Sequence, residues 1–256
     1  MSFHQYQPCA SLQPYVELLA VQETTGSQAY TVLPSPKVVL GFQYRGTLAY
    51  YAAARTELAT AGITGICSEF RVFENSPHTG TVLVVFKPGG AAPFFRSSLH
   101  ELFQQSIALA DVVPRPALAH LQEQLDQAQA ADERVRLVEA FLLAQLQPTG
   151  PDQLVQAALR SIYHANGLVR MTTLARQLGT SSSPLEKRFR RALGATPKKV
   201  ASIVQLTHAI SQYRAGQSLT ELSHATGFYD QAHFIHAFRA FTGQAPAAYF
   251  KSELLG

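Results

Sequence analysis

The sequence predicts an α+β amino-terminal domain, a small antiparallel β sheet or barrel plus helices, followed by an all-α domain with two helix-turn-helix units joined by a linker helix. Two observations carry this prediction. Apolar residues alternate with period two in the part before residue 90, and one helical pattern occurs twice in residues 171–250. The clearest break in the chain is Gln147-Pro-Thr-Gly-Pro151. We therefore predict domains at residues 1–147 and 152–256, with a linker at residues 148–151.

The strands of the first domain are predicted from alternation and from β-branched runs. Val38, Leu40, Phe42 and Tyr44 alternate with the residues between them, which predicts a strand with one buried face. Residues 48–52 and 69–73 are expected as further strands.

The last strand is expected at Thr81–Phe86, a short β-branched run that predicts burial on both faces. It ends at Pro88-Gly89-Gly90, which lacks the lysine and spacing of a P-loop and is interpreted as a turn. Near the amino terminus, Gln5–Pro8 is expected to be irregular, and Pro14–Gln22 fits either a short helix or a strand.

Apolar residues at helical spacing predict two amphipathic helices after the sheet. They are Leu118, Leu121 and Leu125 in the first helix and Val135, Val138, Leu142 and Leu146 in the second. Asp132 is the expected N-cap of the second helix. The apolar faces suit either a dimer contact or a cover for the sheet, and both interpretations stay open.

The repeated pattern of the second domain is Leu-x-x-x-x-Gly, then a polar turn, then two apolar residues four positions apart. The two copies are Leu174 to Gly179 with Leu185 and Phe189, and Leu222 to Gly227 with Phe234 and Phe238. Each copy ends at a glycine three residues before a proline, Gly194 before Pro197 and Gly243 before Pro246. This spacing is typical of a helix C-cap, so each copy predicts helix, tight turn, helix.

Three further elements complete the second domain. A helix is expected from about Asp152 to His164, ended by Asn166-Gly167. Apolar residues at helical spacing in Val200–Tyr213 predict the linker helix between the two units. Ser218-Leu-Thr-Glu221 has the form of a capping box at the start of the second unit.

Composition is that of an ordinary globular protein, with 46% hydrophobic and 10% aromatic residues. Cys9 and Cys67 form no metal or redox spacing and no disulfide framework, which suits a reducing cytoplasm. Residues 1–20 lack the pattern of a signal peptide, and no apolar run approaches the length of a membrane span. We expect a cytoplasmic protein with no membrane partner, no cofactor, no metal site and no catalytic residue.

The net charge of +4 is distributed unevenly along the chain. Residues 151–256 carry 12 Lys and Arg against 5 Asp and Glu, whereas residues 1–150 carry 9 against 12. Cations clustered on helix-turn-helix units are typical of phosphate binding. A merely solvated surface would not explain why the charge segregates with the motif.

The second domain carries a set of motifs at fixed spacing. They are Leu174-Ala-Arg-Gln-Leu-Gly-Thr-Ser181, Phe189 with Gly194 and Pro197, Leu219-Thr-Glu-Leu-Ser-His-Ala-Thr-Gly-Phe228, Asp230-Gln-Ala-His-Phe234, Phe238-Arg239 and Thr242-Gly-Gln-Ala-Pro246. Together they resemble the DNA-binding domain of AraC/XylS-type bacterial transcription regulators, over roughly residues 152–250. The resemblance implies a sequence-specific DNA-binding regulator, by family expectation an activator, whose first domain binds an effector, dimerises, or does both.

In that family the second helix of each unit enters the major groove of DNA. The resemblance implies these DNA-facing residues: Ser182, Ser183, Glu186, Lys187, Arg190 and Arg191 in the first unit, and Gln231, Ala232, His233, His236 and Arg239 in the second. Gln231 can pair with N6 and N7 of adenine, and Lys187 can donate to O6 and N7 of guanine. Glu186 can accept a hydrogen bond from N4 of cytosine. The arginines are expected to hold phosphates, which sets register rather than sequence preference.

Three positions leave alternatives open or depart from the family pattern. Ser183-Pro-Leu-Glu186 has the form of a capping box, in which case Glu186 bonds the backbone and reads no base. With Ser181 as the cap, Glu186 is free instead. Gln205 stands where many relatives have an arginine, and Ser223 replaces a frequent alanine, with a hydroxyl that can bond back to its helix.

The implied partner is double-stranded DNA, and the family allows RNA polymerase, a small-molecule effector and a second copy of the chain as further partners. The sequence does not separate an effector sensor from a domain that only dimerises. The rival class is an enzyme, such as a DNA-repair methyl transferase, that carries a similar DNA-binding tail. Such an enzyme pairs the tail with a cysteine-rich zinc domain, so two scattered cysteines disfavour it.

Overall fold

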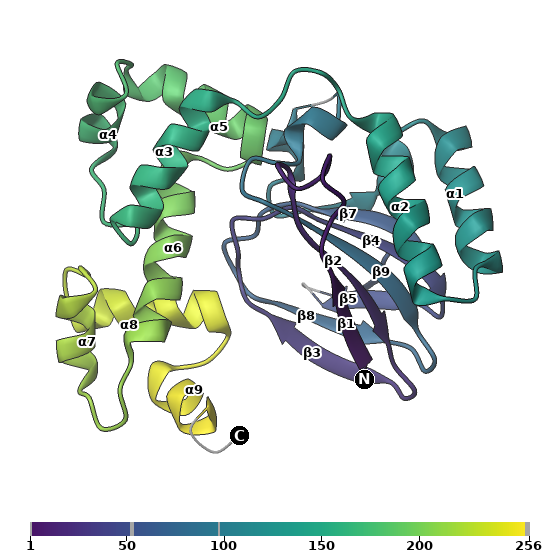
Figure 1. Ribbon diagram of the computed structural model, residues 1–256. Coiled ribbons are helices and arrows are strands. Elements are labelled where there is room, and N and C mark those ends of the chain that lie inside the picture. The colour runs from purple at the N-terminus through teal and green to yellow at the C-terminus, as the bar shows by residue number, and fades with distance from the viewer. Residues whose placement is uncertain (1, 52–53, 97, 254–256) are drawn as a thin grey trace.

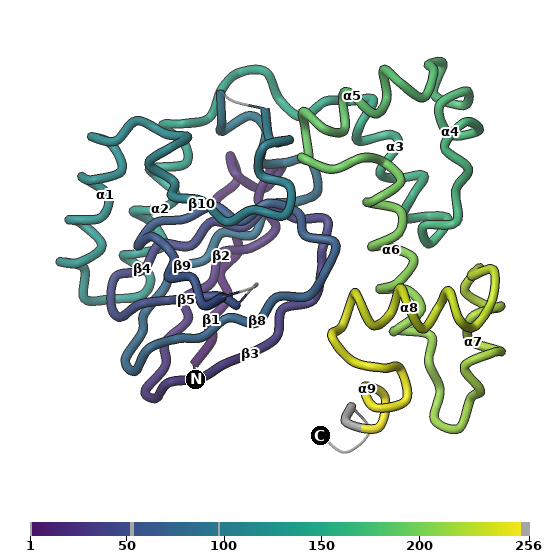
Figure 2. Tube along the Cα trace, turned by 180° about the vertical axis from the view of Figure 1, so that it is seen from behind, coloured from purple at the N-terminus to yellow at the C-terminus, as the bar shows by residue number. Residues whose placement is uncertain are grey.

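The computed structural model describes residues 2–51, 54–96 and 98–253. They form a sheet domain, from β1 to α2, and a helical domain, from α3 to α9, which lie side by side (Figures 1 and 2). This architecture confirms the predicted fold class. Among the described residues, no helix combines the length and the apolar character that crossing a membrane requires.

The sheet domain contains two antiparallel sheets. The six-stranded sheet has the order β1 (Ser2–Tyr6), β2 (Val16–Glu23), β9 (Gly80–Phe86), β4 (Val39–Arg45), β7 (Ala61–Thr64) and β10 (Ser106–Ala108). The four-stranded sheet has the order β3 (Gln28–Val32), β8 (Arg71–Asn75), β5 (Leu48–Tyr51) and β6 (Arg55–Glu57). Three short 3-10 helices follow the strands: η1 (Ala92–Phe94), η2 (Leu99–Leu102) and η3 (Leu109–Asp111).

The strands expected from the sequence are present close to their predicted positions, although Ala52 lies outside the described residues. The segment that fitted either a helix or a strand is β2. The prediction of irregular structure near the amino terminus is wrong for Gln5 and Tyr6, which pair with Ala20 and Leu19 of β2. The neighbouring strand, rather than any local pattern, supplies the hydrogen bonds that make this segment extended.

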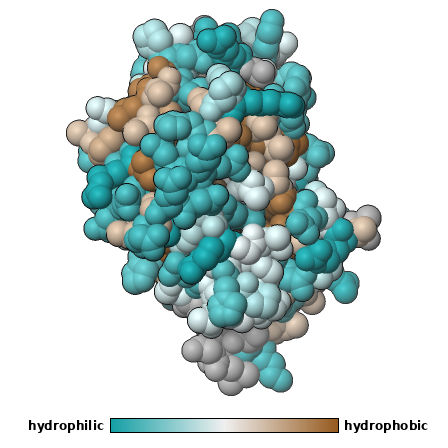
Figure 3. Space-filling model, turned by 90° about the vertical axis from the view of Figure 1, so that its right-hand side faces the viewer, coloured by the Kyte–Doolittle hydropathy of each residue, from teal (hydrophilic) through white to brown (hydrophobic). Residues whose placement is uncertain are grey.

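Helices α1 (Arg115–Gln127) and α2 (Ala131–Gln145) cover one face of the six-stranded sheet (Figure 1). The buried residues of these helices are Leu118, Leu121, Leu125, Val135, Val138, Phe141 and Leu142. Their apolar faces therefore cover the sheet, which decides between the two roles left open by the sequence. The side of the molecule that Figure 3 shows is mostly hydrophilic, with separate apolar spots.

The N-cap predicted for α2 is wrong. The N-cap is Ala130, with no side-chain cap hydrogen bond, and Asp132 lies inside the first turn. There its negative charge faces the positive end of the helix dipole, which is favourable without a capping bond.

The other face of the six-stranded sheet and the four-stranded sheet enclose a cavity of about 370 Å³. On β9, Val82, Val84 and Phe86 are buried in the helix-covered core, whereas Leu83 and Val85 line the cavity and keep partial exposure. The prediction that this strand is buried on both faces is wrong for the face that carries Leu83 and Val85. The four-stranded sheet does not pack directly on that face, because the cavity lies between them.

The helical domain consists of α3 (Gln153–His164), α4 (Met171–Gln177), α5 (Ser182–Leu193), α6 (Pro197–Gln212), α7 (Leu219–Ala225), α8 (Gln231–Thr242) and α9 (Pro246–Glu253). Helices α4 and α5 form the first helix-turn-helix unit, and α7 and α8 form the second. Helix α6 connects them, as Figure 1 shows. The six apolar residues of the sequence repeat that lie on these four helices are all buried in one core: Leu174, Leu185, Phe189, Leu222, Phe234 and Phe238.

Local capping begins and ends these helices, and the capping box and the two C-cap glycines are those that the sequence predicts. Asp152 caps α3 by accepting two backbone N–H groups at 3.0 and 3.2 Å. The Ser218 and Glu221 side chains accept from each other's backbone N–H at 3.1 and 3.2 Å, which completes the capping box. Gly194 and Gly243 end α5 and α8 with φ of +84° and +79°, a conformation that glycine adopts without steric cost.

The same two glycines are where α5 and α8 meet the sheet domain. A Cβ on Gly194 would lie 2.5 Å from the carbonyl oxygen of Leu99 in η2. A Cβ on Gly243 would lie 2.8 Å from ring carbons of Phe70, whose N–H donates to the carbonyl of Ala240 at 3.4 Å. The carboxy-terminal ends of both helices therefore rest on the sheet domain.

Candidate nucleic-acid interface

All the predicted DNA-facing residues lie on α5 or α8. Their side chains are exposed except those of Glu186 and Gln231, which are partly buried. Each helix has 12 residues and is therefore about 18 Å long. Because the C-cap glycine of each helix touches the sheet domain, the first turns, with Ser182 and Ala232, lie at the opposite end of the helix from that contact.

In the first unit, α5 begins directly after Ser181, and the Glu186 carboxylate pairs with Arg190 one turn later at 2.6 Å. The N-cap position is Ser181, as one of the two interpretations holds, although its side chain forms no capping hydrogen bond. Ser183 lies inside the helix, so the interpretation of Ser183 and Glu186 as a capping box is wrong. Glu186 is free of the backbone, but its charge is shared with Arg190. On the same helix, Arg188 pairs with Asp152 of the α3 cap at 3.0 Å.

In the second unit, α8 is started by Asp230, whose Oδ1 accepts from the backbone N–H of His233 at 2.7 Å. The Oε1 of Gln231 accepts a hydrogen bond from the Thr220 hydroxyl of α7 at 2.7 Å. Tyr229, just before the cap, is 88% exposed and stands beside the first turn of α8. Sequence reasoning missed Tyr229 and Thr220. The position of Tyr229 in the turn was an available signal, whereas the Thr220 contact depends on how the two helices pack.

The turn of the second unit is held by the segment between α3 and α4 and by α6. Leu168 lies so close to Gly227 that a Cβ on this glycine would overlap its side chain. Gln205 on α6 donates to the carbonyl of Thr226 at 2.9 Å. Gln205, the departure from the family arginine, is therefore a buttress that ends α7. Ser223 is buried, and its hydroxyl bonds back to its own helix as expected.

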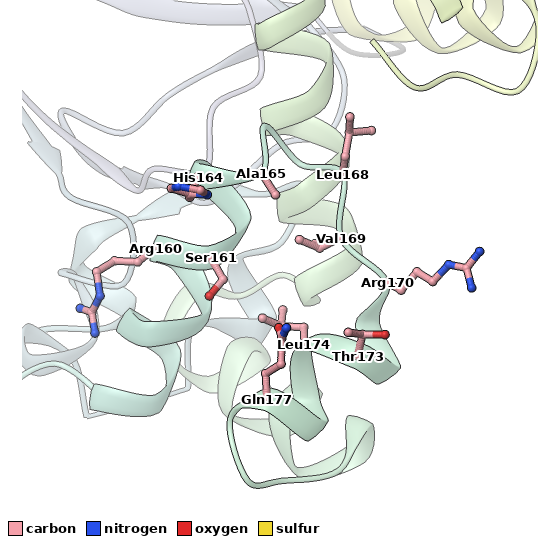
Figure 4. Close-up of a pocket in the computed structure, with 10 residues that line it drawn as sticks. All are labelled: Arg160, Ser161, His164, Ala165, Leu168, Val169, Arg170, Thr173, Leu174 and Gln177. Atoms are coloured by element: carbon pink, nitrogen blue, oxygen red, sulfur yellow. The ribbon is translucent and has the colours of Figure 1, made fainter. Parts of the chain in front are cut away.

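An open groove of about 660 Å³ lies between α3 and α4, the first helix of the first unit (Figure 4). Arg160 and Arg170 extend outward on opposite sides of it, and His164 lies beside Arg160. Its ten lining residues include no acidic side chain. The groove contains no residue of α5, so it adds positive charge to the first unit without taking part in the predicted base contacts.

Cys67 is buried, and its thiol ionises less readily than a free one. Burial raises the pKa of the Cys67 thiol, and the nearby Arg71 offsets only part of this effect. A buried, protonated thiol is a poor nucleophile. Within the described part of the chain, no three His, Cys, Asp or Glu side chains are grouped to hold a metal ion.

Comparisons with known protein families match two separate parts of the chain. Residues 174–252 match a family described as a helix-turn-helix domain, and residues 4–108 match one described as a domain of unknown function, DUF6597. No curated protein sequence matches the chain significantly.

Solved structures with a distant likeness include two of ToxT from Vibrio cholerae. An apo lysine-to-alanine variant has a TM-score of 0.45 and 12% identity, covering 91% of this chain and 96% of that chain. The form with bound unsaturated fatty acid has a TM-score of 0.44 and 12% identity, covering 90% and 93%. The AraC-like transcriptional activator CuxR has a TM-score of 0.34 and 17% identity, covering 85% and 82%.

The helix-turn-helix match falls on the two units, whose caps, turns and shared core are those that the motifs imply. The carboxy-terminal part of the chain is therefore a double helix-turn-helix domain of the AraC type.

Proposed function

We propose that this chain is a transcription regulator that binds a split DNA site in a sequence-specific manner, with α5 in one major groove and α8 in the next, about one helical turn away. One observation carries the proposal. Both helices meet the sheet domain at their final glycine and leave their first turns exposed. A recognition helix reads bases mainly with its amino-terminal residues, so the exposed ends are the ones that base contacts need.

The side chains on these helices have distinct proposed roles. Gln231 pairs with adenine and Lys187 with guanine, while Arg191 and Arg239 hold phosphates. In the free protein the Glu186 carboxylate is paired with Arg190. On DNA, Arg190 leaves this pair for a phosphate, and the carboxylate is then free to accept a hydrogen bond from cytosine N4. The remaining proposed contacts to the groove or its walls are Ser182, Ser183, Ala232, His233 and His236.

We also propose that a small molecule controls DNA binding from the cavity between the two sheets. A volume of about 370 Å³ lies in the range of small-molecule sites. Its apolar lining includes Val39, Leu83, Val85 and Ile107, and its polar lining includes Gln22, Gln43, Lys37 and Arg71. This lining suits a mainly apolar molecule with a few polar groups.

The segment Gly65–Arg71 connects this cavity to the helical domain. Its odd-numbered residues, such as Cys67, line the cavity, whereas Ile66 is buried in the helical core and Phe70 contacts α8. Gln104 holds the segment in place by bonding the Ile66 carbonyl at 3.0 Å and both the N–H and hydroxyl of residue 68. The residues that line the cavity and the residues that contact the helical domain alternate in this one short segment. A ligand that displaces the cavity-lining residues therefore also changes the contact of Phe70 with α8.

The DNA proposal is tested by selecting bound duplexes from a random library with full-length protein at near-physiological salt. Enrichment of two short elements about one turn apart is the expected result. Salt-sensitive binding without enrichment would contradict sequence-specific recognition under those conditions.

The effector proposal is tested by a thermal-shift screen of the full chain with a matched cavity variant. Gly41 lines the cavity, and a Cβ there would meet nothing closer than 3.7 Å, so Gly41→Leu fills the cavity without displacing backbone. A ligand of this cavity raises the Tm of the natural protein and has no effect on the variant. An absence of hits from a broad library would favour a sheet domain that only dimerises.

A further inference from the structure

The hydrogen bond between Thr220 and Gln231 joins the two helices of the second unit at the place where DNA is proposed to bind. Thr220 is the second residue of α7, and Gln231 is the first residue of α8. The Thr220 Oγ1 lies 2.7 Å from the Gln231 Oε1, which is an ordinary length for an O–H···O hydrogen bond. A glutamine amide oxygen only accepts, so in this arrangement the threonine hydroxyl is the donor.

The backbones on both sides of this bond are held independently of it. The capping box of Ser218 and Glu221 fixes the first turn of α7, and the Ser223 hydroxyl donates to the Thr220 carbonyl at 2.8 Å. The Asp230 cap fixes the first turn of α8. The hydroxyl therefore acts on the Gln231 side chain and not on the path of the chain.

The consequence for Gln231 is a defined orientation of its carboxamide. The last torsion of a free glutamine is broad, so oxygen and nitrogen exchange places readily. With the oxygen held toward α7, both N–H groups and one oxygen lone pair stay available. These are the groups that a bidentate contact with adenine N7 and N6 uses.

The first unit lacks this arrangement, which shows that it is not a general requirement of the fold. By the sequence repeat, Thr172 on α4 corresponds to Thr220, and Ser182 at the start of α5 corresponds to Gln231. Both threonines are exposed, yet among the described residues no hydrogen bond joins Thr172 to Ser182. The chain therefore offers a matched control within the same molecule.

We propose that Thr220 is a positioning residue for base recognition, which orients the Gln231 carboxamide and thereby sets the preference of the second unit at one base pair. This inference rests on the proposed DNA-binding role of α8 and adds a residue that does not itself read the base. Because the hydroxyl acts through Gln231, its removal changes the preference at that pair and leaves the other positions of the site unchanged.

The experiment measures the affinity of the full chain for the selected site and for its variants at each base pair, with Thr220→Val, Thr220→Ser, Gln231→Ala, the double variant Thr220→Val with Gln231→Ala, and Thr172→Val. We expect Thr220→Val to lower the preference at one base pair by roughly three- to tenfold, the effect of one neutral hydrogen bond. Thr220→Ser keeps the hydroxyl and the preference. The double variant matches Gln231→Ala, and Thr172→Val matches the natural protein.

A uniform loss across all base pairs in Thr220→Val, or effects that simply add in the double variant, would overturn the positioning role. If Thr220→Val keeps the base-pair preference of the natural protein unchanged, the positioning role of Thr220 is overturned, while the proposed DNA-binding role of α8 stands. If the natural protein shows no preference at any base pair read by α8, both the proposed function of α8 and the role of Thr220 are overturned.

Discussion

The ring of Phe70, from the sheet domain, lies against Gly243, the glycine that ends α8. The two are distant in the chain, and Phe70 directly precedes β8, whose first residue lines the cavity. Phe70 therefore contacts the end of α8, while the next residue, Arg71, lines the proposed effector site. Gly243 has no side chain to keep the ring at a distance, which explains why the approach is so close.

Phe70→Ala is expected to loosen the last turn of α8. The substitution removes the ring that packs on Gly243, and losing part of one aromatic contact costs about 1 kcal/mol. Hydrogen exchange measured on the full chain checks this, with faster exchange expected in residues 238–243. Tyr229→Ala, at an 88% exposed position of the same unit, is the control and leaves this exchange unchanged.

Gly227→Ala is expected to lower the free energy of unfolding by about 1–3 kcal/mol. The glycine has φ of +75°, and the new methyl group would overlap Leu168. Chemical denaturation measures the loss. In a Leu168→Ala background the overlap is gone and only the backbone strain remains. Gly227→Ala is therefore expected to lower the free energy of unfolding less in that background than in the natural protein. An equal cost in both backgrounds would mean that the contact between Leu168 and Gly227 is unimportant.

Arg239→Ala is expected to weaken binding to all DNA sequences and to lower the slope of log affinity against log salt by about one. The reason is that a phosphate contact releases a counterion whatever the base sequence. Titrations at several salt concentrations provide the slope. Arg136→Ala, an exposed arginine on α2, is the matched control and should not change it. A base-specific loss in Arg239→Ala would contradict the phosphate role.

Glu186→Gln is expected to strengthen general DNA binding and to make its salt dependence steeper by about one. The 2.6 Å ion pair with Arg190 is exposed and contributes little to stability, so its main effect is to neutralise a cation on the DNA-facing helix. The same salt titrations measure this change. An unchanged slope would show that Arg190 does not reach a phosphate.

The thiol of Cys67 is expected to react slowly at neutral pH and to reach its full rate above its ordinary pKa of 9.0, because burial raises the pKa. In the unfolded chain the thiol ionises at lower pH, so its contribution to stability is present below pH 9.0 and is lost as pH rises through the folded-state pKa. Alkylation rates against pH in a Cys9→Ser background measure this. Equal rates in folded and urea-unfolded protein would contradict the buried position.

The parts of the fold that depend on near neighbours in the chain were predictable. The Ser218 capping box, the C-cap glycines and the buried repeat residues all follow from contacts between residues a few positions apart. The missed strands have no such local basis. β3 is almost wholly exposed and extends only because β8 pairs with it, and β10 has three residues held by β7.

The candidate site divides in the same way. The spacing of the motifs placed every predicted DNA-facing residue on α5 or α8, because helix position follows from sequence position. Which of those side chains already has a partner did not follow. The Glu186 pairing, the Gln205 buttress and the bond from Thr220 to Gln231 depend on rotamers and on the packing of separate helices.

The sequence by itself determined that this chain carries two helix-turn-helix units, where their helices begin and end, and which faces they bury, since local hydrogen bonds and the 3.6-residue period decide these features. Only the tertiary structure decided that the two sheets leave a cavity between them and that α5 and α8 both end on the sheet domain. Those outcomes depend on surfaces formed by residues far apart in the chain, such as Phe70 against Gly243, whose meeting no local interaction encodes.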